Sequence, residues 1–375
     1  MIIGIDGNEA NIENRVGVNQ YAYQLLVNLK KLQDKEKTKH EFVIFLKNKP
    51  LSDLPHESDS WKYMVLRGKG LWVITRLTPY LLRNKGNIDL FFSPSHYLPP
   101  FSRIPMVCSI MDLGYLEFSD QFKKRDFWQL KYWTARSICV AKKVVAISHA
   151  TKNDIVRHYN CARNKVEVVY LGYNSDVYNN NIDVNDVRRI KNKYAMGQDY
   201  LLFLSTLKPN KNIEGLIQSF GLISKKHKNL KLIIAGKKGW LYESIFDLVK
   251  KSKLEEKIVF TGFVAEKEKP ALIKGAKIFV LPSFWEGFGL DVLSAMACGV
   301  PVVVSNRGSL PEVVGKAGKI INPDNIDELS NSMDEILNMS KKAYNKLIKT
   351  GYSQATKFSW EKTATETLKI FDKFE

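Results

Sequence analysis

Short apolar runs alternate with longer amphipathic stretches along the first half of the chain. The runs expected to form strands are Ile2–Asp6, Phe42–Leu46, Ile88–Ser93, Met106–Ile110, Val144–Ser148 and Val166–Leu171, and helices are expected at Asn19–Leu32 and Phe127–Ala141. Buried strands that alternate with helical stretches indicate βαβ units and a mostly parallel sheet.

The pattern breaks at Tyr173–Asp186, which is rich in asparagine and poor in hydrophobic residues, as is typical of a linker. It then restarts, with strands expected at Tyr200–Ser205, Leu232–Gly236, Ile258–Thr261, Ile278–Pro282, Val302–Ser305 and Lys319–Ile321, and helices at Asn212–Ser224, Glu243–Lys251 and Asp291–Cys298. The last stretch, Ser359–Phe374, predicts one amphipathic helix with Ser359 as its N-cap. We therefore predict an α/β chain of two doubly wound parallel-sheet halves, with a ligand-binding cleft between them.

Composition supports two folded domains and indicates an anionic partner. The chain has 375 residues, of which 45% are hydrophobic, enough to bury two cores, so disorder is excluded. Lys and Arg number 57 against 39 Asp and Glu, a net charge of +18. Such an excess suits nucleic acid, a membrane surface or a phosphorylated substrate.

Cysteine and histidine patterns favour a cytoplasmic protein without a metal site. The four cysteines form no CxxC pair and all have apolar neighbours, which predicts buried thiols. The six histidines show no metal-ligand spacing, and neither HExxH nor DxD occurs. The opening MIIGIDGNE has no basic segment or cleavage site, so we expect no secretory signal, and no apolar run is long enough to span a bilayer.

The most informative segment is residues 279–305, FVLPSFWEGFGLDVLSAMACGVPVVVS. A buried strand ends at Pro282, a short loop contains Glu286 and then Gly287, Phe288 and Gly289, and a helix follows. Glycines let backbone N–H groups approach a ligand, and a helix start adds free N–H groups and a positive dipole end. The segment therefore predicts a phosphate or diphosphate site, with a tight strand-to-helix turn as the alternative.

This segment resembles the signature of the family-4 group of retaining GT-B glycosyltransferases, in which a glutamate precedes GFG and AMACG-PVV follows. Further segments resemble other elements of the same family: residues 4–21, 205–220 (STLKPNKNIEGLIQSF), 231–240 (KLIIAGKKGW), 261–264 (TGFV) and 307–315 (RGSLPEVVG). The resemblance implies a GT-B fold of two Rossmann-like domains facing each other across a cleft. It places an acceptor-side domain at 1–175 with the C-terminal helix 357–375, and a nucleotide-sugar domain at 180–356.

The resemblance also implies roles for residues of the donor side. Glu286 would contact hydroxyls of the donor sugar, and Lys211 would neutralise the diphosphate leaving group. The expected donor-binding residues are Gly17, Arg15, Thr206, Lys208, Gly236, Val264, Gly287, Phe288, Gly289, Leu290 and Ser294. Where many relatives have an arginine, this chain has Asn210, and Lys208 or Arg15 are the candidate substitutes.

Two further positions depart from the family pattern. Ser294 stands where relatives have the glutamate that holds the ribose, and Asp291, on the same helical face, is a candidate substitute. Residues 105–113 resemble a strand that ends in a histidine–aspartate pair; Asp112 is present and assigned to the catalytic set, whereas Met111 replaces the histidine. On the acceptor side, we name Met111, His96 and His149 as candidates, with a structural role and a surface helix cap as alternatives for the two histidines.

Two stretches of the first half, Trp61–Lys85 and Phe122–Lys143, mix aromatic and basic side chains. Such segments suit an anionic membrane surface and also nucleic acid, while core aromatics beside solvated lysines are the structural alternative. Because the family often uses lipid-linked acceptors, we favour the membrane and expect no nucleic-acid partner.

We therefore expect a cytoplasmic, metal-independent, retaining hexosyltransferase, with peripheral contact at the inner face of the membrane as an open question. It would use a GDP- or UDP-hexose as substrate, need no cofactor and act on a glycan or lipid-linked acceptor. The AGKKGW turn resembles mannosyltransferase-like members, which favours mannose. The rival hypothesis is a catalytically weakened nucleotide-sugar-binding or scaffold protein of the same fold.

Overall fold

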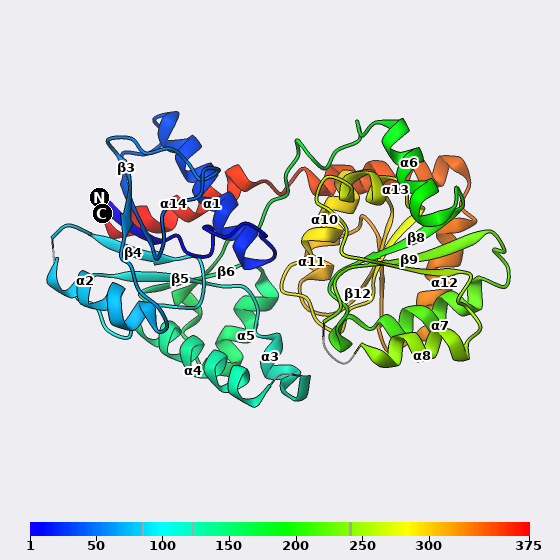
Figure 1. Ribbon diagram of the computed structural model, residues 1–375, viewed down its shortest axis with the longest axis horizontal. Helices are drawn as coiled ribbons and strands as arrows, with labels where there is room; N and C mark the ends of the chain where they lie inside the picture. The colour runs from blue at the N-terminus through cyan, green and yellow to red at the C-terminus, as the bar shows by residue number, and fades with distance from the viewer. Residues whose placement is uncertain (85, 122, 240–241) are drawn as a thin grey trace. The chain divides into compact units, whose positions relative to one another are not determined.

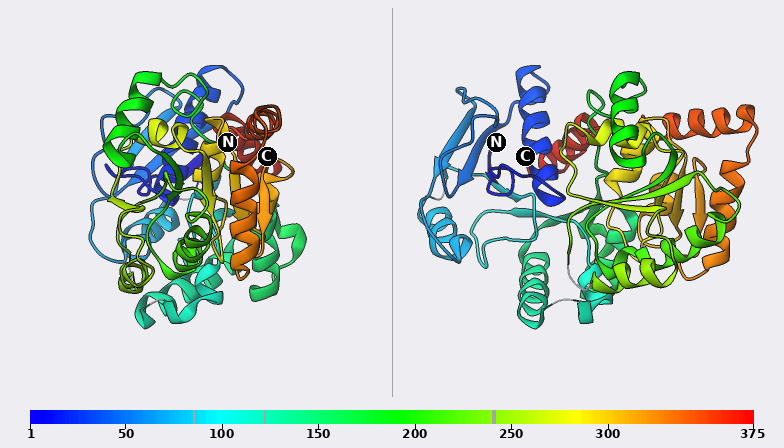
Figure 2. Two further views of the ribbon diagram at one scale, coloured as in Figure 1. Left: turned by 90° about the vertical axis from the view of Figure 1, so that its right-hand side faces the viewer. Right: turned by 45° about the vertical axis from the view of Figure 1, so that its right-hand side comes forward.

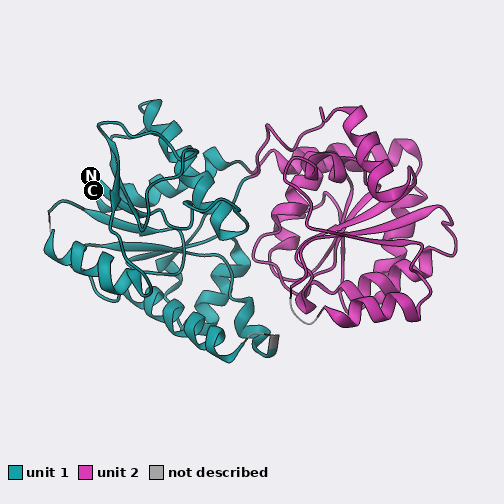
Figure 3. Cartoon of the chain, viewed as in Figure 1, with its two compact units in different colours: residues 1–172, 359–375 teal, residues 173–358 magenta. Residues whose placement is uncertain are grey.

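The protein divides into two compact units (Figure 3). A computed structural model describes residues 1–84, 86–121, 123–239 and 242–375. Unit 1 comprises residues 1–172 and 359–375, and unit 2 comprises residues 173–358. Three residues of the stretches singled out in the sequence, Lys85, Phe122 and Trp240, lie outside the described residues.

Unit 1 contains a seven-stranded sheet in the order β3-β2-β1-β4-β5-β6-β7, and every neighbouring pair is parallel. Its strands are β1 (Ile2–Asp6), β2 (Glu41–Leu46), β3 (Trp61–Val65), β4 (Leu90–Ser93), β5 (Met106–Ile110), β6 (Lys143–Ala146) and β7 (Val166–Val168). Its helices are α1 (Val18–Asp34), the π-helical turn η1 (Val73–Leu77), α2 (Thr78–Arg83), α3 (Gly114–Glu117), η2 (Ser119–Gln121), α4 (Lys124–Val140), α5 (His149–Tyr159), η3 (Arg163–Lys165), α14 (Trp360–Phe371) and η5 (Asp372–Phe374).

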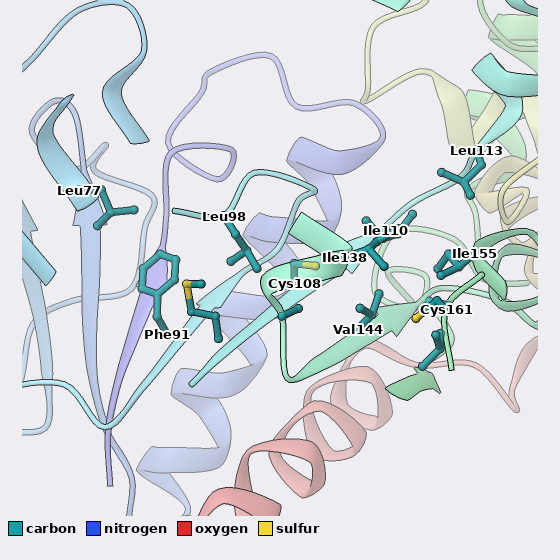
Figure 4. Packing of buried hydrophobic residues seen from close by; sticks show 14 of the residues in the cluster. Leu77, Phe91, Leu98, Cys108, Ile110, Leu113, Ile138, Val144, Ile155 and Cys161 are labelled. Atoms are coloured by element: carbon teal, nitrogen blue, oxygen red, sulfur yellow. The ribbon is translucent and has the colours of Figure 1, made fainter. Parts of the chain in front are cut away.

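Helices cover both faces of this sheet because its strands have apolar side chains on both faces. On one face, side chains of η1, α4 and α5 cover the strands. Figure 4 shows Leu77, Ile138 and Ile155 from these helices in one buried cluster with Phe91 of β4. On the other face lie α1 and α14, where Phe92 meets Phe371 with ring centroids 5.2 Å apart. A parallel sheet buried in this way reads as continuous apolar runs, which is why most of its strands were recognisable.

Unit 2 contains a six-stranded parallel sheet in the order β10-β9-β8-β11-β12-β13. Its strands are β8 (Asp199–Leu204), β9 (Leu230–Ala235), β10 (Ile258–Gly262), β11 (Ile278–Leu281), β12 (Val302–Ser305) and β13 (Lys319–Ile321). Its helices are α6 (Val184–Ala195), η4 (Pro209–Lys211), α7 (Ile213–Ile223), α8 (Glu243–Lys251), α9 (Lys269–Lys274), α10 (Leu290–Ala297), α11 (Leu310–Val314), α12 (Ile326–Leu337) and α13 (Lys341–Ala355), several of them labelled in Figure 1.

Both sheets have the doubly wound strand order, which reverses direction once. The reversal lies between β1 and β4 in unit 1 and between β8 and β11 in unit 2. At such a point the loops after the two strands leave in opposite directions and open a crevice at the carboxyl edge of the sheet. The expected two-part α/β fold is therefore confirmed, and the sheet order indicates one candidate ligand-binding edge in each unit.

The C-terminal helix completes unit 1 although all of unit 2 precedes it in the chain. Ser359 caps α14 as expected, its hydroxyl accepting a hydrogen bond from the Lys362 N–H at 3.1 Å. A Cβ atom on Gly172 would lie 2.1 Å from the backbone nitrogen of Trp360. Only glycine therefore fits where the chain leaves unit 1 beside the start of α14.

The sequence missed one strand, and one expectation was wrong. Trp61–Val65 forms the edge strand β3, which was not among the expected strands; Trp61 and Trp72 are buried, as the core-aromatic alternative requires. The expectation that all four thiols are buried was wrong. Cys139 is exposed, because it lies on the outer face of α4, whereas Cys108, Cys161 and Cys298 are buried.

Within the described part of the chain, no helix combines the length and apolarity that crossing a bilayer requires.

Candidate active site

A lysine–glutamate pair lies at the point where the sheet order of unit 2 reverses. Lys211 ends the short turn η4 after β8, and Glu286 lies in the loop after β11. The Lys211 Nζ donates to Glu286 Oε1 at 2.6 Å, and the Ser283 hydroxyl donates to the same oxygen at 2.9 Å. Each side chain of the pair is 14% exposed, so the two charges are mostly shielded from water but remain reachable.

The backbone holds the loop of Glu286 in place from two sides. The Phe284 N–H donates to the Asn210 carbonyl at 2.9 Å, which ties this loop to the Lys211 turn. The Ser309 N–H and hydroxyl both donate to the Glu286 carbonyl at 3.1 Å. Gly308, with φ +58°, has no room for a Cβ atom, which would lie 2.4 Å from that same carbonyl oxygen.

Helix α10 begins immediately beside this pair. Gly289, with φ +93°, is its N-cap and has no side chain with which to cap the helix. The Val292 and Leu293 N–H groups donate to the Gly289 carbonyl at 3.1 and 3.2 Å, and the positive end of the helix dipole lies at this start. Phe288 is buried against Phe358, with ring centroids 5.8 Å apart, so it anchors the loop through its side chain. Gly287 and Leu290, on either side of these residues, are partly buried. A cation and a helix start thus converge on one edge of the sheet.

Asp291 adds a second carboxyl group in the first turn of α10. Burial raises its pKa to about 6; Lys269 opposes the rise and Glu286 adds to it. Ser294 is 6% exposed and lies one turn further along the helix. Burial also raises the pKa of Tyr178, with a contribution from Asp291, so the two side chains are electrostatic neighbours. The candidate ribose side therefore has an acidic group, at a position different from that of the family's second glutamate.

The remaining donor-side residues lie in the loops that follow β8, β9 and β10. Gly236, with φ +148°, leaves no space for a Cβ atom, which would lie 1.8 Å from the Ser205 carbonyl oxygen. Thr206 and Lys208 follow Ser205 and are both partly buried. Val264 is 1% exposed, so its side chain belongs to the core. Gly236 and Val264 therefore shape the loops, and any ligand contact they make comes from the backbone.

In unit 1, Met111 and Asp112 directly follow β5 at the carboxyl edge of the sheet. Asp112 is exposed, and its Oδ1 accepts from the Gly114 N–H at 3.0 Å. The Met111 carbonyl accepts from the Thr151 hydroxyl at 3.3 Å. His149, the first residue of α5, is exposed and packs edge-on against Tyr170. These side chains belong to one edge of unit 1.

Two of the candidates serve unit 1 in other ways. The Arg15 guanidinium donates to the Ala10 carbonyl at 2.8 Å, pairs with both oxygens of Asp53 and stacks 3.9 Å from the Tyr23 ring centroid. These contacts hold the Arg15 guanidinium within unit 1, and its role at the donor stays a prediction. Gly17, with φ +53°, is the N-cap of α1 and has open space around it, so only its backbone conformation requires glycine.

His96 follows β4 and has the character of a neutral histidine. Burial lowers its pKa to about 4, and its Nε2 is buried without a hydrogen-bond partner among the described residues. Its ring centroid lies 4.0 Å from that of Tyr97.

Sequence reasoning missed a polar cluster directly after β1. Asp6 is 6% exposed, and its Oδ1 accepts from the Asn8 N–H at 3.0 Å. The Asn19 amide donates to Glu9 Oε2 at 2.5 Å. Burial raises the pKa of both carboxyls, against the opposing effect of Lys47. Their position after the first strand of a doubly wound sheet was the signal that could have identified them.

Among the side chains that the structure describes, no three His, Cys, Asp or Glu residues gather closely enough to hold a metal ion.

Comparisons with known proteins identify the family of the chain. Residues 185–354 match the family model described as glycosyl transferases group 1, and residues 17–177 match the model described as glycosyltransferase family 4. The chain is 31% identical over 286 residues to the O-antigen chain mannosyltransferase B of Escherichia coli, covering 75% of this chain and 74% of that protein. It is 30% identical over 227 residues to the serotype-specific mannosyltransferase WbdA of Escherichia coli, of whose length it spans 28%.

Among solved structures, HepE from Anabaena in complex with UDP and glucose superimposes with a TM-score of 0.75 at 17% identity, covering 99% of both chains. At that identity the likeness concerns the fold, which is the GT-B fold of two parallel-sheet α/β domains. The chain belongs to the family-4 glycosyltransferases. It is therefore a glycosyltransferase.

Proposed function

We propose that this glycosyltransferase moves a hexose, with retention of anomeric configuration and without a metal ion, from a nucleotide sugar to a glycan or lipid-linked acceptor. The observation that supports the proposal most directly is the Lys211–Glu286 pair beside the uncapped start of α10. A diphosphate needs positive potential and a sugar needs a hydrogen-bonding carboxylate, and these residues offer both at one sheet edge.

In this proposal Lys211 and the first-turn N–H groups of α10 stabilise the charge that develops on the diphosphate as its bond to the sugar breaks. The Lys211 and Ser283 hydrogen bonds both fall on Oε1 of Glu286, so Oε2 can accept from a donor hydroxyl. Asp291 holds the ribose in place of a glutamate at Ser294. Its position in the first turn of α10 supports this role.

Unit 1 binds the acceptor, with Asp112 and His149 among its contacts. Met111 provides no general base, so the departing phosphate oxygen takes the proton of the attacking acceptor hydroxyl on the same face of the sugar. That step forms the new glycosidic bond and breaks the bond to phosphate without help from a protein base. The reaction would then depend on how firmly unit 2 holds the diphosphate.

Mannose is the hexose that we favour, because similar chains are named as mannosyltransferases. The nucleotide is GDP or UDP; a similar fold has been solved with UDP and glucose. We place the reaction in the cytoplasm, where nucleotide sugars are available as substrates, at the inner face of the membrane for a lipid-linked acceptor.

A thermal-shift screen of GDP, UDP and their hexose conjugates tests the donor, because a ligand that binds the folded state raises its stability. Transfer to an acceptor panel then tests the reaction, and the anomeric configuration of the product tests retention. Glu286→Ala should abolish transfer, whereas Glu255→Ala, an exposed glutamate of the same unit, should leave it unchanged.

Transfer that survives Glu286→Ala would overturn the assignment of the site. Tight donor binding without transfer to any acceptor would instead support the rival hypothesis of a weakened nucleotide-sugar-binding protein. Activity that is lost with a chelator and restored by a divalent cation would contradict metal independence.

A further inference from the structure

We propose that one face of helix α4 docks unit 1 onto an anionic lipid bilayer. This surface, called here the α4 face, consists of Lys124, Arg125, Trp128, Lys131 and Tyr132 on α4, with Phe101 on the loop between β4 and β5. The inference extends the proposed function by naming the surface that meets the membrane, and the binding it describes needs neither donor nor acceptor. Figures 1 and 2 show α4 as a long teal-green helix on the outside of unit 1.

Large aromatic side chains on this face lie in water. Tyr132 is 66% exposed and Trp128 is 47% exposed, one helical turn apart. Their rings stack on one another with centroids 5.5 Å apart and planes at 22°. Phe101 is 61% exposed, and its loop is held against α4 by the Arg136 Nε, which donates to the Pro100 carbonyl at 3.1 Å. Exposed aromatics grouped in this way mark an interaction surface.

The charges around these rings have one sign. Along α4 the basic residues are Lys124, Arg125, Lys131 and Arg136, against a single acid, Asp126. Lys131 Nζ lies 5.1 Å from the Trp128 ring centroid, so the cation borders the apolar surface. None of these four basic side chains forms an ion pair with a described carboxylate, so their charge is available to an anionic partner.

Helix α14, on the opposite face of the same sheet, has a different pattern. Its Glu361 pairs with Lys37 at 3.1 Å, and its Lys369 pairs with Glu366 at 2.9 Å. Mixed charges that pair locally are the ordinary solvent-facing pattern of a soluble helix. The excess of positive charge is therefore a property of the α4 face and not of every helix in unit 1.

A bilayer fits this face better than a nucleic acid does. Single-stranded nucleic acids bind by stacking bases on open aromatic rings. Trp128 and Tyr132 already stack on each other, so neither presents both ring faces to a base. An amphipathic aromatic pair flanked by lysine and arginine instead suits the interface, where rings enter the headgroup region and cations meet anionic lipids.

The position of the α4 face is consistent with a lipid-linked acceptor. Helix α4 follows β5 and the Met111–Asp112 segment, so its first turns lie near the carboxyl edge of the sheet. Trp128 is the fifth and Tyr132 the ninth of the 17 residues of α4. A membrane held there would bring acceptor headgroups to the edge of unit 1 that contains Asp112.

Co-sedimentation of the full-length protein with vesicles tests this inference. We expect binding to vesicles that contain phosphatidylglycerol, much weaker binding to pure phosphatidylcholine, and weakening of the former at high salt. Lys124→Glu/Arg125→Glu should reduce binding to the anionic vesicles about tenfold or more, because each basic residue near such a surface contributes attraction. Trp128→Ala/Tyr132→Ala should reduce it by a similar factor.

Lys250→Glu/Lys251→Glu on α8 of unit 2 is the matched control, since it changes net charge equally at two exposed positions. It should bind anionic vesicles within about threefold of the unchanged protein. Lipids brominated along the acyl chain should quench Trp128 fluorescence, a loss that Trp128→Phe removes.

Three outcomes would overturn the inference: no binding to anionic vesicles, equal losses in the control and in the α4 variants, or displacement of the vesicles by duplex DNA from the same face. Donor-induced thermal shifts should be unchanged in every α4 variant. The proposed function can therefore survive a negative vesicle result, and vesicle binding can be observed even if transfer is never found.

Discussion

Breaking the Lys211–Glu286 pair should lower stability and activity in separable ways. The two charges lie 2.6 Å apart, which at an effective dielectric constant of about 20 gives an attraction of about 6 kcal/mol. The cost of removing both groups from water offsets most of this attraction, and each side chain is still 14% exposed. We therefore expect a net coupling of about 2 kcal/mol between the two residues.

A double-mutant cycle measures this coupling. Lys211→Met and Glu286→Gln should each lower the free energy of unfolding by about 2 kcal/mol, because each leaves a shielded polar group without its partner. The double variant should lose about 2 kcal/mol, not 4, since neither charge is then left unpaired. Denaturant unfolding gives the three values.

Activity should follow a different pattern. Lys211→Met removes a cation that acts on the developing charge, so kcat should fall about 100-fold or more. The double variant should lose less free energy of unfolding than the two single variants together, but its transfer activity should not recover. Lys319 and Glu335 form a control pair with the same 2.6 Å separation but greater exposure, and their coupling should stay below about 1 kcal/mol.

The reasoning would be refuted by a Lys211–Glu286 coupling below about 1 kcal/mol, the range of a solvated surface pair. Transfer by Lys211→Met within tenfold of the unchanged enzyme would refute the role of the lysine at the diphosphate even if the coupling were large.

Three further predictions concern single positions. The folded-state pKa of Asp291, about 6, lies above its unfolded value of 3.8, so the fold favours the protonated form and stability should fall as pH rises from about 4 to 6. In pH-dependent unfolding, Asp291→Asn should remove up to about 3 kcal/mol of that fall and leave the similar contribution of Asp154. Gly236→Ala should destabilise unit 2 by more than about 3 kcal/mol in thermal unfolding, because its Cβ would lie 1.8 Å from a carbonyl oxygen. Gly221→Ala in α7, where a Cβ would make only ordinary contacts, should not destabilise it in this way. Equal effects of the two substitutions would contradict this account. Ser359→Ala should lower the free energy of unfolding by about 1 kcal/mol, because the α14 cap is lost, whereas Ser359→Asn should keep most of the stability. An unchanged Tm in the alanine variant would show that the cap contributes nothing.

The sheet architecture was predictable because a strand that is buried on both faces has an uninterrupted run of apolar residues in its sequence. Strand β3 was not predicted, for the opposite reason. It is an edge strand in which the exposed Lys62 lies between a fully buried and a partly buried residue, so its pattern resembles that of a surface segment. The exposure of Cys139 was not predicted, because apolar neighbours in the sequence do not determine which face of a helix a residue occupies.

The site shows the same division between local pattern and tertiary contact. The glycines and Glu286 after β11 form a short segment whose turn and helix start can be predicted from residue type. The ion pair of Glu286 with Lys211 spans 75 residues and depends on β8 and β11 being neighbours. The Arg15–Asp53 pair spans 38 residues, and nothing in the local pattern around Arg15 indicated that a partner would occupy its guanidinium.

The return of the chain to unit 1 has a consequence for biosynthesis. The last seventeen or so residues, 359–375, supply α14, whose Phe371 and Trp360 fill the core of unit 1 against Phe92 and Tyr21. During translation, every residue of unit 2 emerges from the ribosome before this helix does. Unit 1 is made first but can complete its core only after all of unit 2 has been synthesised, because part of one face of its sheet stays uncovered until α14 arrives.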